Sequence, residues 1–432
     1  MRILVLGAYG LIGSHIIRRL NDDGHHIIGL GRRIGAASRR YDFADWVEID
    51  IGRLTDPADW AAMLDGIDGL INSAGVLQTG LADNVERVQA TAMRACFRAC
   101  QAKPVRLVVQ ISALGAAADA PTQFMRTKAT ADAFLTGLDL DWTILRPALV
   151  IAPNAYGGTA MIRALASLPA IIPHIDAAKR IQTVSVDDVA DTVARCVRGD
   201  LPVRRSYDLA NPQIHSFADL VAIHRQSMGQ KPARIVRIPN WLVYFTGRLA
   251  DAAGFLGWRS PMRTTALRQL AADVVGDPAD WIRETGIRPM SLSDSLQRYR
   301  LGIETAWFGR LYILKPVIIA TLSLLFVASG IIAAGPGFTT AAGILESVGL
   351  DARNAAGLAV LGGVVDIMVG VAILIRPLAK AALAAMAALC LAYLVLGTLF
   401  MPALWLDPLG PLVKIVPVLA LITVAAAILA DR

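Results

Sequence analysis

Three glycines near the start of the chain have the spacing of a phosphate-binding turn. Gly7, Gly10 and Gly13 lie three residues apart, between an apolar run at residues 2–6 and a segment with apolar residues at helical spacing. In such a strand-turn-helix unit, the first glycine permits the tight turn and the second lets the backbone approach a diphosphate. The third allows the helix to pack closely on the strand, and the first amides of the helix face the phosphates. The sequence therefore predicts a dinucleotide site at this turn.

Two arginines, Arg32 and Arg33, end the segment predicted as the second strand, residues 25–33. An NAD-specific site carries an acidic residue here that binds the adenosine ribose hydroxyls, whereas a guanidinium suits a ribose 2′-phosphate. We therefore expect NADP(H) as the cofactor in preference to NAD(H). The alternative interpretation is a solvated pair of arginines without a ligand.

A sheet is needed to hold the glycine turn and the arginines in place, and the strand pattern predicts one. Further strands are expected at residues 45–51, 69–75, 106–112 and 141–147, with helical patterns between most of them. Alternating strands and helices predict an α/β domain, a Rossmann-type doubly wound parallel sheet with helices on both faces. A cofactor lies along the carboxyl ends of such strands. The candidates by position are Asp50, Ala74, Gly75, Ser112 and Pro147.

Several segments together resemble the atypical short-chain dehydrogenase/reductase superfamily. They are ILVLGAYGLIG at 3–13, NSAG at 72–75, ISALG at 111–115, Lys128, ILRPALV at 144–150 and VSVDDVA at 184–190. The resemblance is nearest to the group that includes the nucleotide-binding accessory subunit of respiratory complex I. It implies an NAD(P)-binding domain over residues 1–300, with the substrate side formed from about residue 150 onward.

This resemblance implies a cofactor contact for most of the candidate residues. The residues expected to line the diphosphate are Gly7, Tyr9, Gly10, Leu11 and Ile12, and those expected at the adenosine end are Arg32 and Arg33. The residues expected to flank the adenine are Asp50 and Ile51, and those expected to cover the ribose are Ala74, Gly75 and Val76. The residues expected around the nicotinamide are Ser112, Lys128 and Pro147.

The chain departs from the superfamily at Phe124. Catalytic members carry a tyrosine at this position, four residues before the lysine, which acts as the general acid or base. A phenyl ring cannot exchange a proton, although Lys128 can still hold the nicotinamide ribose and Ser112 can still polarise a carbonyl. We therefore expect Ser112 and Lys128 as catalytic candidates, with water, Tyr156 or the substrate itself as the proton donor. The alternative is a site that binds the cofactor without turnover.

The last third of the chain has the composition of a membrane domain. The hydrophobic fraction of 55% is high for a soluble protein, and the excess lies after about Leu311. Four stretches reach the roughly 20 apolar residues that a membrane-spanning helix needs. They are residues 311–334, 355–375, 379–400 and 412–430. This tail resembles the DoxX-like family, so the second domain, residues 301–432, is expected to be an all-α transmembrane four-helix bundle.

Cations favour one orientation of these spans. Arg298, Arg300, Arg310 and Lys315 lie before or at the start of the first span, and Arg376 with Lys380 lies between the second and third. The other two loops have fewer cations, each accompanied by acidic residues. The positive-inside rule therefore predicts a multi-pass protein of the cytoplasmic membrane, with both termini and the nucleotide domain in the cytoplasm.

Two further segments have alternative interpretations. Asp366 lies near the middle of the second span, where an ionisable group is costly and commonly faces the bundle interior or a polar cavity. It either handles protons or quinones or forms a structural hydrogen bond to Thr321, Ser323 or Tyr393.

Residues 239–259 concentrate large apolar side chains, which suits either a helix in the membrane interface or a helix packed on the sheet.

Charge and cysteine patterns argue against other functions. The net charge of +7 comes from Lys and Arg scattered among acidic residues, without the clustered cations of a nucleic-acid site. No metal site is predicted, because the Cys and His residues lack ligand spacing.

The leading hypothesis is a membrane-anchored NADP(H)-binding oxidoreductase that acts on a lipophilic substrate, such as a quinone, an isoprenoid or a lipid. The competing hypothesis is a non-catalytic accessory or assembly subunit of a membrane protein complex.

Overall fold

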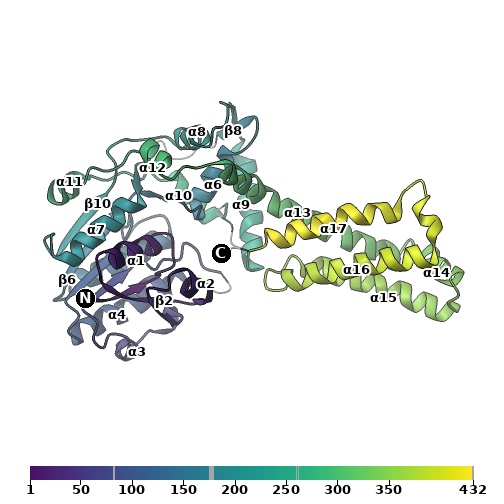
Figure 1. Ribbon diagram of the computed structural model, residues 1–432, viewed down its shortest axis with the longest axis horizontal. Coiled ribbons are helices and arrows are strands. Elements are labelled where there is room, and N and C mark those ends of the chain that lie inside the picture. The colour runs from purple at the N-terminus through teal and green to yellow at the C-terminus, as the bar shows by residue number, and fades with distance from the viewer. Residues whose placement is uncertain (81–82, 175–179, 259, 261, 431–432) are drawn as a thin grey trace. The chain divides into compact units, whose positions relative to one another are not determined.

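A computed structural model describes residues 1–80, 83–174, 180–258, 260 and 262–430 (Figure 1). The chain forms two compact units, and its path crosses between them more than once. Met1–Asp251 and Ser260–Gly309 make up the first unit, and Ala252–Arg259 and Arg310–Arg432 make up the second. Residue 259, the last of the aromatic-rich segment, lies outside the described residues.

Seven parallel strands form the main sheet of the first unit, in the order β10-β6-β5-β4-β1-β2-β3. They are β1 (Arg2–Leu6), β2 (His26–Gly31), β3 (Asp45–Glu48), β4 (Gly69–Asn72), β5 (Leu107–Ile111), β6 (Asp141–Pro147) and β10 (Arg205–Leu209). The strand order reverses between β1 and β4, and ligands of such sheets bind at the carboxyl ends beside this reversal. The predicted Rossmann-type fold is confirmed.

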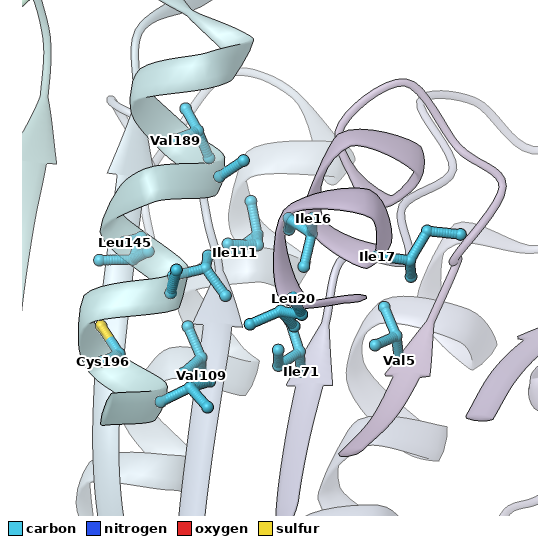
Figure 2. Packing of buried hydrophobic residues seen from close by; sticks show 14 of the residues in the cluster. Val5, Ile16, Ile17, Leu20, Ile71, Val109, Ile111, Leu145, Val189 and Cys196 are labelled. Carbon is cyan, nitrogen blue, oxygen red and sulfur yellow. The ribbon is translucent and has the colours of Figure 1, made fainter. Parts of the chain in front are cut away.

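Helices cover both faces of this sheet because successive strand residues point to opposite sides. Val5 lies beside α1 (Gly13–Asp22), and α7 (Val186–Arg198) covers the same face of the sheet nearer to Ile111 and Leu145 (Figure 2). The neighbouring Leu4 faces the other side, towards α4 (Ala92–Ala102) and α5 (Gln123–Thr136). Each of these fully buried aliphatic side chains contributes about 1.5–3 kcal/mol, so the two layers fix the sheet that carries the site.

Shorter elements complete the first unit. Two small parallel sheets pair β7 (Leu149–Ile151) with β9 (Thr183–Ser185) and β8 (Ile171–His174) with β11 (Arg234–Arg237). The remaining helices and turns are α2 (Gly35–Arg40), η1 (Ile51–Arg53), α3 (Pro57–Trp60), η2 (Arg87–Thr91), α6 (Gly157–Ala166), α8 (Phe217–Ser227), α10 (Thr264–Ala271), α11 (Ala279–Thr285) and α12 (Leu292–Arg298). Helix α9 (Asn240–Phe255) runs across the boundary between the units.

The second unit consists largely of apolar helices, several of which lie side by side (Figure 1). They are α13 (Ile303–Ala334), which belongs to this unit from Arg310 onward, α14 (Phe338–Ser347), α15 (Ala352–Ala372), α16 (Ala379–Phe400) and α17 (Pro411–Ala427), with the turn η3 (Pro402–Trp405). Among the described residues, α13, α15 and α16 are long and apolar enough to cross a membrane. These helices indicate a membrane protein.

The predicted fourth span differs from the other three. It was expected at residues 412–430, but α17 has only 17 residues, which is about 26 Å at the α-helical rise. A proline, Pro417, also lies inside it. Helix α14, between the first two spans, was not predicted, because its 10 residues lack the charged face of a typical surface helix.

Helices α13 and α15 approach closely at glycines. A Cβ atom added to Gly330 would lie 2.3 Å from the carbonyl oxygen of Gly363, and one added to Gly363 would lie 2.7 Å from the carbonyl oxygen of Gly330. A Cβ on Gly370 would lie 2.9 Å from the backbone nitrogen of Val327. Small residues of this kind allow membrane helices to pack backbone against backbone.

Candidate functional site

The glycine turn between β1 and α1 has the backbone geometry of a phosphate cradle. Gly7 has a φ of +71°, and its carbonyl accepts a hydrogen bond from the Gly10 amide at 2.8 Å. A Cβ on Gly7 would lie 2.9 Å from the Cα of Ala74, and one on Gly13 would lie 2.2 Å from the Gly7 carbonyl oxygen. Only glycine fits these positions, so the turn sits tightly against the end of β4. The other candidates of the turn, Tyr9, Leu11 and Ile12, are half-buried.

Tyr9 joins the glycine turn to the end of β2. A Cβ on Gly31 would lie 2.0 Å from Cε1 of the Tyr9 ring, and the Arg32 backbone N–H donates to the Tyr9 hydroxyl at 3.3 Å. Arg33 is exposed beside it. At the end of β3, the Asp50 carboxylate accepts a hydrogen bond from the Gly52 amide at 3.1 Å, and Ile51 is buried. The candidates expected at the adenosine end therefore lie on neighbouring strands.

Arg32 has a partner that the sequence did not suggest. Its Nη2 lies 2.6 Å from Oδ1 of Asp83, in the segment after β4. Burial lowers the pKa of the Arg32 guanidinium, but the Asp83 carboxylate, with smaller contributions from Asp50 and Tyr9, raises the pKa overall. The cation expected to meet a 2′-phosphate is thus already held by a carboxylate.

A chain of buried polar side chains links the ends of β4 and β5 to α5. Asn72 Nδ2 donates to Gln110 Oε1 at 2.7 Å, and Gln110 Nε2 donates to Asp132 Oδ1 at 3.3 Å. Ser112 Oγ forms a short hydrogen bond with the other Asp132 oxygen, Oδ2. Burial raises the pKa of Asp132, although its hydrogen bond to Ser112 and the charge of Lys128 oppose this rise. Asp132 was not among the residues predicted from the sequence, although it follows Lys128 by four residues and therefore shares its helix face.

The Lys128 side chain lies at the carboxyl end of β5. Its Nζ donates to the Ile111 carbonyl at 2.7 Å and lies 5.8 Å from the centre of the Phe124 ring. A Cβ added to Gly75 would lie 3.9 Å from this nitrogen, so the end of β4 is adjacent. Burial lowers the pKa of Lys128 to about 8, and the Asp132 charge only partly offsets this. Pro147 ends β6, the neighbour of β5.

Gln89 is a second residue that the sequence did not reveal. Its Nε2 donates to the Val76 carbonyl at 3.0 Å, while its Oε1 is buried and has no hydrogen-bond partner among the described residues. The Cβ position of Gly75 lies 3.9 Å from this oxygen as well as from Lys128 Nζ. Gln89 belongs to the π-helical turn η2, a feature frequent at functional sites. A buried acceptor calls for a donor, and the hydroxyl of a cofactor ribose fits that need.

A cavity of about 260 Å³ opens beside the N-terminus of α5. Three arginines line it, Arg126, Arg263 and Arg268, together with Gln78 and several threonines. Among the described lining residues there is no carboxylate. Such a lining suits an anionic or strongly polar group of a ligand. Tyr156, which the sequence offered as a proton donor, does not line this cavity and is 47% exposed before α6.

Asp366 is buried within the second unit, where α15 meets α16. The Tyr393 hydroxyl lies 3.5 Å from each carboxylate oxygen of Asp366. Ser323 instead donates to the Gly370 carbonyl at 2.6 Å, and Thr321 is exposed. Of the three expected partners, Tyr393 alone contacts the carboxylate in the described structure.

Comparisons with known proteins agree with this architecture. Residues 7–200 match a family described as NAD(P)H-binding, and residues 323–423 match the DoxX-like family. The chain is 24% identical over 252 residues to the ceramide reductase of Caulobacter vibrioides, which covers 58% of this chain and 77% of that protein. It is 25% identical over 253 residues to the photosystem II assembly factor Ycf39 of Synechocystis sp., which covers 57% of this chain and 73% of the factor.

The fold is also similar to that of a crystal structure solved with a bound dinucleotide. The Bordetella bronchiseptica enzyme WbmH, in complex with NAD+, superposes with a TM-score of 0.51 at 17% identity. The similarity covers 70% of this chain and 97% of WbmH, which shows a shared fold. The chain therefore joins a Rossmann-fold unit that is similar to an NAD(P)H-binding family to C-terminal helices that are similar to the DoxX-like family.

Proposed function

We propose that this protein is a membrane-anchored, NADP(H)-dependent oxidoreductase that reduces a carbonyl group on a lipophilic substrate, such as a quinone, an isoprenoid or a lipid. The observation that carries the proposal is the buried set of Ser112, Lys128 and Asp132, which meet where α5 packs on the carboxyl end of β5. The apolar helices favour a lipophilic substrate, because an anchor raises the enzyme concentration where such molecules reside. The similarity to a protein named ceramide reductase supports the same substrate class.

The site would hold the dinucleotide by its own backbone and a few side chains. The glycine turn at Gly7 would receive the diphosphate, Arg32 and Arg33 a 2′-phosphate, and Gln89 with Lys128 the nicotinamide ribose. The two guanidinium groups favour NADP(H) over NAD(H). When bound in its reduced form, the cofactor supplies the hydride.

Asp132 would supply the proton that Phe124 cannot. Because burial raises the pKa of Asp132, its carboxyl is protonated to a higher pH than an exposed aspartate. Ser112 Oγ is hydrogen-bonded to Asp132 Oδ2. As the substrate carbon gains the hydride, Ser112 Oγ donates its proton to the carbonyl oxygen and takes the Asp132 proton in return. The Asp132 carboxylate that remains lies near the Lys128 ammonium, which stabilises its charge.

Two surfaces favour a substrate that enters from the membrane interface. The arginine-lined cavity beside α5 suits a polar or anionic head group. Helix α9 exposes large apolar side chains, with Trp241 69% exposed, Tyr244 63% exposed and Phe255 76% exposed. Their exposure favours an interfacial helix over one that packs these side chains on the sheet. With the cation pattern of the loops, this supports a cytoplasmic location for both termini and the Rossmann domain.

A second candidate function has its own support. The protein would then be a non-catalytic accessory or assembly subunit that holds a nucleotide and docks on a membrane complex. Phe124 favours this function, because the usual proton donor is missing. The similarity to the assembly factor Ycf39 favours it as well.

Turnover separates the two functions. The protein, purified in detergent, would be titrated with NADPH by calorimetry and then assayed for NADPH oxidation with quinones, isoprenoid carbonyls and ceramide-like ketones in mixed micelles. We expect oxidation that depends on the acceptor and is lost in Ser112→Ala, whereas Ser227→Ala, a serine on α8, stays active. Binding without oxidation by any acceptor would support the accessory role. Absence of NADPH binding would contradict both functions.

A further inference from the structure

We propose that the DoxX-like unit binds one anionic phospholipid in a groove between α16 and α17. The groove is a cavity of about 590 Å³ with Arg376 and Lys380 in its lining. Its volume lies within the range of small-molecule sites. This proposal does not depend on the oxidoreductase activity.

Small side chains create the apolar part of the groove. Ala384 and Ala387 of α16 face it together with Ala426 of α17, so neither helix fills the space between them. Its apolar lining also includes Leu383 and Ile422, which are only 2% and 3% exposed. A groove lined by alanine and aliphatic side chains suits an acyl chain, because van der Waals packing is a main attraction between apolar groups inside a bilayer.

The polar part of the lining is cationic. Lys380 is exposed on the first turn of α16, and Arg376 lies just before that helix. The lining includes no carboxylate among the described residues. A phosphate diester suits this chemistry, because a planar guanidinium can donate to two of its oxygens and an ammonium adds a point charge.

The Arg376 side chain is held in a fixed orientation. Its Nη2 donates to the Leu429 carbonyl at 2.8 Å, and its guanidinium carbon lies 5.5 Å from the centre of the Trp258 ring. Trp258 is itself fixed by a 2.6 Å hydrogen bond from Nε1 to the Leu374 carbonyl. Lys315 lies 5.8 Å from the centre of the same ring. A preorganised cation loses less side-chain entropy when it meets a head group.

Chemistry favours a phospholipid over free phosphate as the occupant. Cations at the ends of membrane helices lie at the depth of lipid head groups, and basic pockets between such helices bind anionic lipids. A free phosphate would use the cations and leave the alanine-lined channel empty. A zwitterionic lipid would bring a further cation next to Arg376 and Lys380. The site therefore suits a lipid with a net negative head group and an acyl chain.

Native mass spectrometry of the full chain in neutral detergent tests the proposal. The probes are dioleoyl phosphatidylglycerol, dioleoyl phosphatidylcholine and inorganic phosphate, each added separately. We expect one phosphatidylglycerol to be retained in preference to phosphatidylcholine. Lys380→Gln should weaken this retention about fivefold, as expected for one cation near a head group. The matched control is Lys414→Gln, an exposed lysine at the other end of α17, and it should retain lipid as the unmodified chain does.

A second variant tests the channel without changing charge. Ala426→Phe fills the groove while both cations remain, so we expect it to lose the lipid and keep its elution volume and NADPH affinity. A variant that no longer elutes as the folded protein would be replaced by Ala384→Phe, which fills the same groove from α16. Equal retention of the two lipids would overturn the proposal. So would full retention of the lipid in a folded groove-filling variant, or retention of inorganic phosphate equal to that of phosphatidylglycerol.

Discussion

The Arg32 guanidinium and the Asp83 carboxylate form an ion pair between the end of β2 and the segment after β4, with 2.6 Å between Nη2 and Oδ1. The Asp83 side chain is only 12% exposed, so solvent screens the pair incompletely. A 2′-phosphate that approaches Arg32 must compete with this carboxylate. The ion pair therefore weakens the binding of NADP(H), which is the cofactor that Arg32 and Arg33 favour.

Replacement of the carboxylate by an amide should relieve that competition. We expect Asp83→Asn to strengthen NADPH binding about fivefold, because partly exposed pairs contribute up to about 1 kcal/mol. NADH binding should not change, since NADH lacks the 2′-phosphate. Calorimetric titration of both coenzymes measures the difference. The double variant Arg32→Ala with Arg33→Ala should weaken NADPH binding only, and an equal loss for both coenzymes would refute the assignment.

A hydroxyl on the ring at position 124 should accelerate turnover. Phe124→Tyr places a phenol one helical turn from Lys128, and a general acid contributes about 10²-fold or more. We expect kcat for NADPH oxidation to rise by that factor. Phe134→Tyr is the control, because Phe134 lies on the same helix but against Arg94 and Arg98. An unchanged rate in Phe124→Tyr would mean that the ring does not face the reacting atoms.

The Asp132 relay predicts a specific pH profile. A general acid must be protonated, so reductase activity should fall as the pH rises through the elevated pKa of Asp132. Asp132→Asn should lower kcat about 10²-fold and abolish this alkaline decline, with the KM for NADPH unchanged. Asp119→Asn, at an exposed position of the same unit, serves as the control. A decline of the same shape in Asp132→Asn would assign the proton to another group.

Lys128 predicts a separate effect on cofactor affinity. Since burial lowers its pKa to about 8, the ammonium is present below that pH and is lost above it. NADPH binding should therefore weaken as the pH rises from 7 to 9. In Lys128→Arg the cation persists throughout this range, so affinity should be flat. Fluorescence titrations of NADPH across the range compare the two proteins, and parallel curves would exclude Lys128 as the titrating group.

The glycine contact between α13 and α15 predicts that glycine-to-alanine changes at two positions of α15 alter the stability of the membrane unit differently. Gly363→Ala pushes a methyl group into the Gly330 backbone and should destabilise the membrane unit by about 1–3 kcal/mol. Gly357→Ala, six residues earlier on the same helix, meets nothing within 4 Å. It should leave stability unchanged or raise it by up to about 1 kcal/mol, because alanine is the better helix former. Melting temperatures in detergent compare the two, and equal shifts would contradict the contact.

Local patterns were sufficient to predict the sheet and the glycine turn. The run Leu107–Ile111 is buried at every position, as a central parallel strand requires, and its apolar sequence predicts this directly. Gly7 and Gly13 are recognisable because only glycine tolerates a left-handed backbone and a contact of 2.2 Å. Such constraints act within a few residues and therefore leave a local signal.

The parts of the site that were missed depend on distant contacts. Asp83 meets Arg32 across 51 positions of sequence, and Asp132 meets Ser112 only after α5 has packed on the sheet. Gln89 points inward through a π-helical turn, which shifts the helical period so that no regular pattern predicts it. A single sequence identifies the cradle but not the polar groups that the fold brings beside it.

The two exits of the chain from the Rossmann unit, after Asp251 and after Gly309, affect how its halves can be separated. Between the exits, the Leu256 carbonyl accepts a hydrogen bond from the Arg376 amide, and Trp258 Nε1 donates one to the Leu374 carbonyl of the helical unit. A fragment that stops before the first span would retain Leu256 and Trp258 without these partners, and their apolar side chains would promote aggregation. Isolation of the Rossmann unit therefore requires two changes to the chain: removal of the membrane helices and replacement of residues 252–259 by a short polar linker.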